Sequence, residues 1–171
     1  MKKNTSQGGV TIKNLKNYQT IINSNLFQRE KDFIQHGDTT VYEHSLMVAE
    51  ESLKLARLLH LKIDEESLIK GALLHDYFLY DWHVKENYHR FHGIKHPIFS
   101  RNNAKRDFGL NKKEENMILS HMFPLMPILP KHKESWILFL ADKICATKET
   151  ISYIYKNNRL LNKIKEFVFS E

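Results

Sequence analysis

Apolar residues recur at steps of three and four along almost the whole chain, which is the spacing of amphipathic helices. The alternation of apolar and polar residues that marks half-buried strands is nearly absent. The clearest helical stripe is supplied by Val41, Leu46, Ala49, Leu53 and Ala56. The pattern therefore predicts an all-α fold.

Capping signals indicate where the first two long helices begin. Asp38 or Thr39 can cap the helix that carries this stripe, because short polar side chains accept hydrogen bonds from the first free backbone N–H groups. Asp64 suits the start of a second helix, since acidic residues follow it and complement the helix dipole. That helix is expected to close at the adjacent pair His75 and Asp76.

Proline, glycine and asparagine mark the next two helices. Pro97 fits the first turn of a helix that Gly109 would end, which places His96 just before the helix. Asn111, with Glu114 three residues later, has the spacing of a capping box at the start of the following helix.

Asp142 interrupts the apolar start of the last long helix, predicted over 133–156. A carboxylate directly after the run from Trp136 to Ala141 is expected to be buried, which is costly unless it is paired or binds a metal. A salt bridge or a helix-face boundary would explain a lone aspartate. Here the pair His75-Asp76 also follows an apolar segment, "GALL".

The order of these residues resembles that of the HD-domain superfamily. The resemblance lies in "VYEHSLMVAEES", "GALLHDYFLYDW", "ILSHMFPL" and "FLADKICA", within residues 36–150. It implies a single-domain, all-helical HD-type bundle over residues 1–171, with flanking N- and C-terminal helices and a metal site between helices. The positions that match metal ligands are His44, His75, Asp76 and Asp142, with His96 and His121 at the extra positions of two-metal members.

The resemblance further implies a metal-dependent phosphohydrolase that cleaves a phosphate ester or anhydride of a nucleotide or related small phosphorylated molecule. The expected cofactors are one or two divalent ions of manganese, iron, magnesium, nickel or zinc. Imidazole and carboxylate ligands leave room for water and a phosphate oxygen, which suits catalysis. In the two-metal arrangement, Asp76 is a catalytic bridge and a hydroxide attacks phosphorus in line. The expected division gives one ion His44, His75 and Asp142 and the other His96 and His121.

Several basic side chains near the expected site are candidates for binding substrate. Lys143 follows Asp142 and is either a catalytic, phosphate-binding lysine or a solvated or salt-bridged one. His92 and Arg101 lie near His96 in sequence and are either substrate-binding or surface residues. His92 is also an alternative to His96 as a metal ligand. The position of His96 at the predicted helix start and the resemblance favour His96. Four further histidines match no ligand position and are expected to be exposed or hydrogen-bonded: His36, His60, His83 and His132.

Composition indicates which partners and which cellular compartment to expect. The chain has 26 Lys and Arg against 20 Asp and Glu, a net charge of +6, but its basic residues are scattered, so nucleic acid is not the expected partner. The longest apolar run is Trp136 to Ala141, far short of the roughly 20 residues that cross a bilayer. A single cysteine, Cys145, and the lack of a signal-peptide pattern favour the cytoplasm.

Two questions stay open at this level. The main alternative to an enzyme is a non-catalytic, regulatory HD module that binds a nucleotide or nucleic acid. The basic, amphipathic segment 157–171 can pack on the core, pair with a second subunit in a homodimer, or fray.

Overall fold

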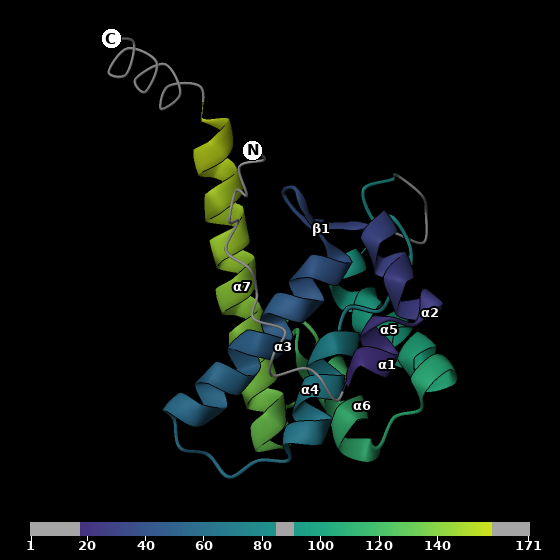
Figure 1. Ribbon diagram of the computed structural model, residues 1–171, viewed down its shortest axis with the longest axis vertical. Helices are drawn as coiled ribbons and strands as arrows, with labels where there is room; N and C mark the ends of the chain where they lie inside the picture. Colours follow the sequence, from purple (N-terminus) through teal and green to yellow (C-terminus); the bar gives the residue numbers. More distant parts are fainter. Residues whose placement is uncertain (1–17, 85–90, 159–171) are drawn as a thin grey trace, which may run out of the picture.

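The computed structural model describes residues 18–84 and 91–158, and helices dominate both ranges (Figure 1). The predicted all-α class is confirmed, with one short antiparallel hairpin in addition. In chain order the elements are α1 (Gln19–Ile22), α2 (Asn25–Gln28), the 3-10 helix η2 (Arg29–Asp32), β1 (Ile34–His36), β2 (Thr39–Thr40), α3 (Val41–Leu58), α4 (Glu65–Leu74), α5 (His92–Phe108), α6 (Lys112–Ser120) and α7 (Lys133–Asn157). Most of the segment 157–171 lies outside the described residues.

Helix α4 lies inside the bundle and packs against α3, α5, α6 and α7 (Figure 1). Its apolar residues are buried on all sides, as expected for a helix surrounded by others. The most buried of them are Leu68, Ile69, Ala72, Leu73 and Leu74, each at most 3% exposed. The chain that leaves α4 at its C-terminal end therefore emerges in the interior of the bundle. Among the described helices, none combines the length and apolar composition that crossing a bilayer requires.

Helix α3 is capped by Thr40, so the prediction of Asp38 or Thr39 is wrong by one or two residues. The Thr40 hydroxyl accepts a hydrogen bond from the Glu43 amide, and the Glu43 carboxylate accepts one from the Thr40 amide. Thr39 cannot cap the helix because it is paired with His36 in the hairpin. This capping box fixes the first turn of α3, which carries His44.

Replacing Thr40 with Ala is expected to lower the free energy of unfolding by about 1 kcal/mol, because the amide of Glu43 loses its acceptor. Urea unfolding followed by far-ultraviolet circular dichroism measures this change. Thr39→Ala is the matched control and should cost clearly less. Equal losses for the two variants would contradict the assignment of Thr40 as the cap.

The other predicted caps are confirmed. Asp64 accepts a hydrogen bond from the Ser67 amide at the start of α4, and Asn111 forms a capping box with Glu114 at the start of α6. Gly109 follows the last residue of α5 with a φ of +64°, in the region that favours glycine. These caps determine where α4, α5 and α6 begin or end, and with them the positions of the side chains at those ends.

Helix α5 begins five residues earlier than Pro97 suggested, so His96 lies inside the helix rather than before it. Phe91, with a φ of 68°, precedes the helix, and His92 is its first residue. The Nδ1 atom of His96 donates to the backbone carbonyl of His92 at 2.9 Å, and the two rings stack 4.6 Å apart. These contacts hold the turn that precedes Pro97.

Candidate metal centre

The six side chains predicted to bind metal lie together in one buried cluster. Each is at most 4% exposed. They come from five helices or their ends: His44 in α3, His75 and Asp76 directly after α4, His96 in α5, His121 directly after α6 and Asp142 in α7. Their role as metal ligands stays a prediction, but the fold brings all six to one place.

Asp76 lies at the centre of the cluster and presents its two oxygens to different pairs of histidines. Its Oδ2 atom is 3.8 Å from Nε2 of His44 and 3.3 Å from Nε2 of His75. Its Oδ1 atom is 3.1 Å from Nε2 of His96 and 3.4 Å from Nε2 of His121. The carboxylate therefore has the geometry of a bridge between two groups of ligands.

Asp142 joins the first of these two groups. Its Oδ1 atom lies 3.2 Å from Nε2 of His44 and 3.8 Å from Nε2 of His75. Its Oδ2 atom accepts a hydrogen bond from Nζ of Lys143 at 2.7 Å. The grouping of His44 and His75 with Asp142 agrees with the division of ligands expected from the sequence.

All four histidines of the cluster are held through their Nδ1 atoms. An imidazole that donates from Nδ1 carries its lone pair on Nε2 when it is neutral, and such a hydrogen bond fixes the orientation of a metal-binding ring. All four Nε2 atoms thus face the cluster. The acceptors are the carbonyl oxygens of Ala72 for His75 (2.7 Å), His92 for His96 (2.9 Å) and Ile118 for His121 (2.7 Å), and the carboxylate of Glu149 for His44 (2.9 and 3.0 Å).

The cluster fits a divalent cation. The Nε2 atoms of His96 and His121 lie only 2.8 Å apart, and two facing lone pairs at that distance require a proton or a cation between them. Among the described residues, Nε2 of His75 and Oδ1 of Asp76 are buried without a hydrogen-bond partner, which is costly unless something else binds them. Imidazole and carboxylate groups are the donors that first-row divalent metals prefer.

Without a cation, protons take its place in the cluster. Burial alone would raise the pKa of Asp76, but the imidazoles of His75 and His96 outweigh it and hold that pKa well below its usual range. Burial alone would likewise lower the pKa of His44, but hydrogen bonds to Asp142 and Glu149 outweigh it and raise the pKa to about 9. The pKa of His75 is also raised well above its ordinary value, because Asp76 outweighs the effect of burial.

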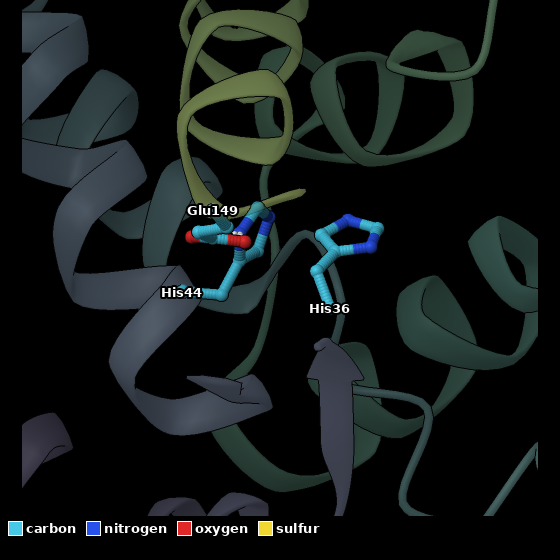
Figure 2. A group of neighbouring side chains, drawn as sticks. All are labelled: His36, His44 and Glu149. Atoms are coloured by element: carbon cyan, nitrogen blue, oxygen red, sulfur yellow. Dashed lines mark hydrogen bonds and ion pairs between the residues drawn. The ribbon is translucent and has the colours of Figure 1, made fainter. Parts of the chain in front are cut away.

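Glu149 was missed by the sequence analysis although it holds His44. It lies in α7, seven residues after Asp142, and a spacing of seven places two residues on the same face of a helix. Its buried carboxylate accepts from Nδ1 of His44 (Figure 2), whereas Nε2 of the same ring faces Asp76 and Asp142. The sequence signal that could have revealed it is this spacing from Asp142.

Replacing Glu149 with Gln is expected to weaken divalent-metal binding by about ten- to a hundredfold, because the ring of His44 loses the charged acceptor that orients it. Competition with a chelating dye measures the metal affinity, and circular dichroism checks the fold. Glu51→Gln, which changes a carboxylate paired with Lys148 on the protein surface, is the control. Identical affinities for all three proteins would show that Glu149 does not support His44.

A cavity of about 180 Å³ opens beside the cluster. It gives Asp76 and Asp142 contact with a space that a ligand can enter. The residues that line it are Gln35, His36, Asp76, Trp82, His92, Gly93, His96, His121, Met122, Asp142, Lys143 and Ala146.

Two of the three predicted substrate-binding residues, Lys143 and His92, line this cavity. The third does not. Arg101 lies in α5 with its guanidinium 3.9 Å from the carboxylate of Glu115 in α6, outside the cavity lining. Its role in substrate binding stays a prediction that this cavity does not support: five residues after His96, it projects about 140° around the helix from that residue.

His96 lies closer to the other predicted ligands than His92 does, although the choice between them as a metal ligand stays a prediction. His96 Nε2 lies 3.1 Å from Asp76, whereas His92 Nδ1 is 2.8 Å from the hydroxyl oxygen of Tyr80. The ring of His92 stacks between those of His96 and Trp82, at centroid distances of 4.6 and 5.0 Å. His92 therefore supports His96 and forms part of the cavity wall.

His36 matched no ligand position, yet it lies beside the cluster. Its half-buried ring meets the ring of His44 edge-on, with centroids 5.3 Å apart, and it lines the cavity. Burial, together with the neighbouring His44, lowers the pKa of His36 below its ordinary value. No pattern in the sequence singled out this histidine.

A comparison with protein families identifies the chain. A family model described as "HD domain" matches residues 41–147, well over half of the 171 residues. Neither the curated proteins nor the solved structures yielded a match. All six cluster residues lie within the matched region, whereas Gln35, His36 and Glu149 lie outside it. The chain therefore belongs to the HD-domain superfamily, as the order of its histidines and aspartates predicted.

Proposed function

We propose that this protein is a metal-dependent phosphohydrolase that cleaves a phosphate ester or anhydride of a nucleotide or related small phosphorylated molecule. The observation that carries the proposal is the convergence of four Nε2 atoms and two carboxylates on a site that borders a cavity. A metal that only fastened helices together would need no such space, whereas a catalytic site keeps a position open for water and substrate.

The two faces of Asp76 support two ions. His44, His75 and Asp142 would hold one, and His96 and His121 the other, with Asp76 shared between them. Manganese, iron, magnesium, nickel and zinc all suit this donor set. When bound, such ions supply Lewis acidity, which activates water near neutral pH and neutralises charge on a phosphoryl group.

Lys143 is placed to bind the phosphate. Its Nζ atom is held 2.7 Å from Asp142 and 3.4 Å from the sulfur of Met122, and its side chain lines the cavity. An ammonium group there attracts a phosphate oxygen and keeps the substrate beside Asp76 and Asp142. Trp82 and Met122 form apolar parts of the wall and limit the access of bulk water.

The size of the cavity limits how much of the substrate it can enclose. About 180 Å³ is less than the roughly 300 to 1,000 Å³ of sites that enclose a whole small-molecule ligand. The phosphoryl end of a substrate fits this space, and the rest of the molecule extends over the rim. We further propose that the enzyme works in the cytoplasm and acts on small molecules rather than on nucleic acid, in line with its scattered basic residues.

The test combines metal analysis with a substrate screen. Protein purified without chelator is analysed for first-row metals and assayed on p-nitrophenyl phosphate, bis-p-nitrophenyl phosphate, nucleoside phosphates and dinucleoside polyphosphates. We expect turnover that a chelator abolishes and added metal restores. Nucleotide binding without any turnover in the metal-loaded protein would overturn the proposal and favour a regulatory binding module.

A further inference from the structure

The β1–β2 hairpin adds two side chains to the cavity from outside the region that the family model matches. That region begins at residue 41, whereas the hairpin ends at Thr40. Gln35 and His36 of β1 both line the cavity beside the cluster. The site therefore has a wall that the family match does not describe.

An irregularity in the hairpin allows both residues to face the cavity. Successive side chains of a regular strand point to opposite faces. Here Ile34 pairs with Thr40 and His36 pairs with Thr39, so β1 advances two residues where β2 advances one. Such a bulge redirects side chains and is frequent next to active sites.

The hairpin is held firmly against the rest of the site. Gly37 has a φ of +63°, and a Cβ atom at this residue would lie 2.6 Å from the ring of Tyr153, so the turn packs directly on α7. On the other side, Nε1 of Trp82 donates to the carbonyl oxygen of Ile34 at 3.2 Å. The position of β1 is thus set by contacts with α7 on one side and with Trp82 on the other.

The two cavity-lining residues of the hairpin have different surroundings. The side-chain amide of Gln35 donates a hydrogen bond to Oδ2 of Asp76, so Gln35 supports the metal centre. The ring of His36 lies further out, against the ring of His44. This half-buried ring lines the cavity and forms no hydrogen bond to His44 or Glu149, the two residues drawn with it in Figure 2. His36 is therefore the hairpin residue available to a ligand in the cavity.

We propose that His36 binds the phosphoryl group of the substrate, donating a ring N–H to a phosphate oxygen opposite the ammonium group of Lys143. This inference rests on the proposed function and adds a substrate-binding residue to it. His36 comes from β1 and Lys143 from α7, and both line the same small cavity as Asp76 and Asp142. A cavity of this size holds a phosphoryl group within reach of its lining residues.

The competing role for His36 is that of a ligand to a third cation, together with His44 and Glu149. Single ligand atoms of these three residues lie within 4.8 Å of one another. However, Nδ1 of His44 already contacts both oxygens of Glu149, at 2.9 and 3.0 Å, while its Nε2 faces the cluster. A third cation bound by His44 would have to break that hydrogen bond, because both nitrogens of the His44 ring already have partners.

The experiment measures the binding of inorganic phosphate to the manganese-loaded protein by isothermal titration calorimetry, with metal content determined in parallel. His36→Leu removes the donor and is expected to weaken phosphate binding by about ten- to a hundredfold, as for a hydrogen bond to a charged group. His36→Gln keeps an N–H donor and should retain most of the affinity. His132→Leu, at the start of α7, is the matched control and should bind as the wild type does.

Each outcome decides one question. Unchanged phosphate affinity in His36→Leu would overturn the inference, even if the wild type hydrolyses phosphate esters. Loss of one metal equivalent in His36→Leu would overturn it in favour of the third-cation role. If the wild type binds phosphate through His36 but turns over no substrate, the proposed function is overturned and the role of His36 in binding phosphate stands. A metal-loaded wild type that binds no phosphate would overturn both.

Discussion

Replacing Asp76 with Asn is expected to give a folded protein that no longer retains its metal and that has lost about a thousandfold or more of its metal-dependent hydrolysis. The carboxylate stands within 3.8 Å of Nε2 of all four cluster histidines, with one oxygen facing each pair. Asparagine keeps the shape but offers one oxygen, no charge and a donor NH₂ group in place of the second oxygen. Elemental analysis and the hydrolysis assay measure the two losses.

Asp32→Asn is the matched control, because Asp32 is an exposed aspartate in η2. It should keep the metal content and activity of the wild type. Circular dichroism must show that Asp76→Asn keeps its helices, so that loss of metal is not a result of unfolding. If the folded variant retained two metal equivalents, Asp76 would not be the bridge between them.

Divalent-metal affinity is expected to rise steeply with pH, by about fiftyfold between pH 7 and pH 9 for a displaced proton whose pKa is about 9. The pKa of His44 is raised to about 9, because its hydrogen bonds to Asp142 and Glu149 outweigh the opposing effect of burial. The pKa of His75 is raised as well. In the metal-free protein these imidazoles therefore hold protons at neutral pH, and a metal ion has to displace them.

Chelator competition at a series of pH values measures the affinity, and the protons released on binding can be counted by calorimetry in buffers of different ionisation enthalpy. Glu149→Gln provides the matched comparison, because removing this acceptor lowers the pKa of His44 and should flatten the dependence. An affinity that does not change from pH 7 to pH 9 would contradict the expectation.

The stability of the metal-free protein should follow the opposite trend. A histidine whose pKa is higher in the folded than in the unfolded state stabilises the fold fully below its unfolded pKa, near 6.5, and loses that contribution as the pH rises through its folded value. For His44 this window runs from about 6.5 to about 9. Metal-free protein should therefore melt at lower temperature as the pH rises through this window, while the metal-loaded protein gains affinity. A melting temperature of the metal-free protein that rose with pH across this window, as the metal affinity does, would contradict this account.

Most of the helices could be predicted because their signals are local. Asp64, Asn111 and Gly109 act within one turn of the chain, and the structure has each of them at the predicted helix end. The start of α5 could not be predicted from Pro97, because what holds the preceding turn is a pair of stacked histidine rings. The hairpin strands have only three and two residues, too few for an alternating pattern to show.

The six residues of the cluster could be predicted from their order along the chain, but their geometry could not. Nothing in the order shows which oxygen of Asp76 faces which histidines, because that depends on how five helices pack. Gln35 and His36 are likewise invisible to pattern reasoning, since a bulge in a short strand brings them to the cavity. The single-domain organisation over residues 1–171 and a homodimer stay predictions.

The anchoring of the four rings has a consequence for how the site tolerates random mutation. Three of the four, His75, His96 and His121, donate Nδ1 to main-chain carbonyls three or four residues earlier. A codon change cannot delete a carbonyl, so these three orientations persist whatever side chains occupy the acceptor positions, provided that the helix turn survives. Only His44 depends on a replaceable side chain, Glu149. Among the groups that orient the four rings, position 149 is therefore the one at which a side-chain substitution is expected to change metal affinity.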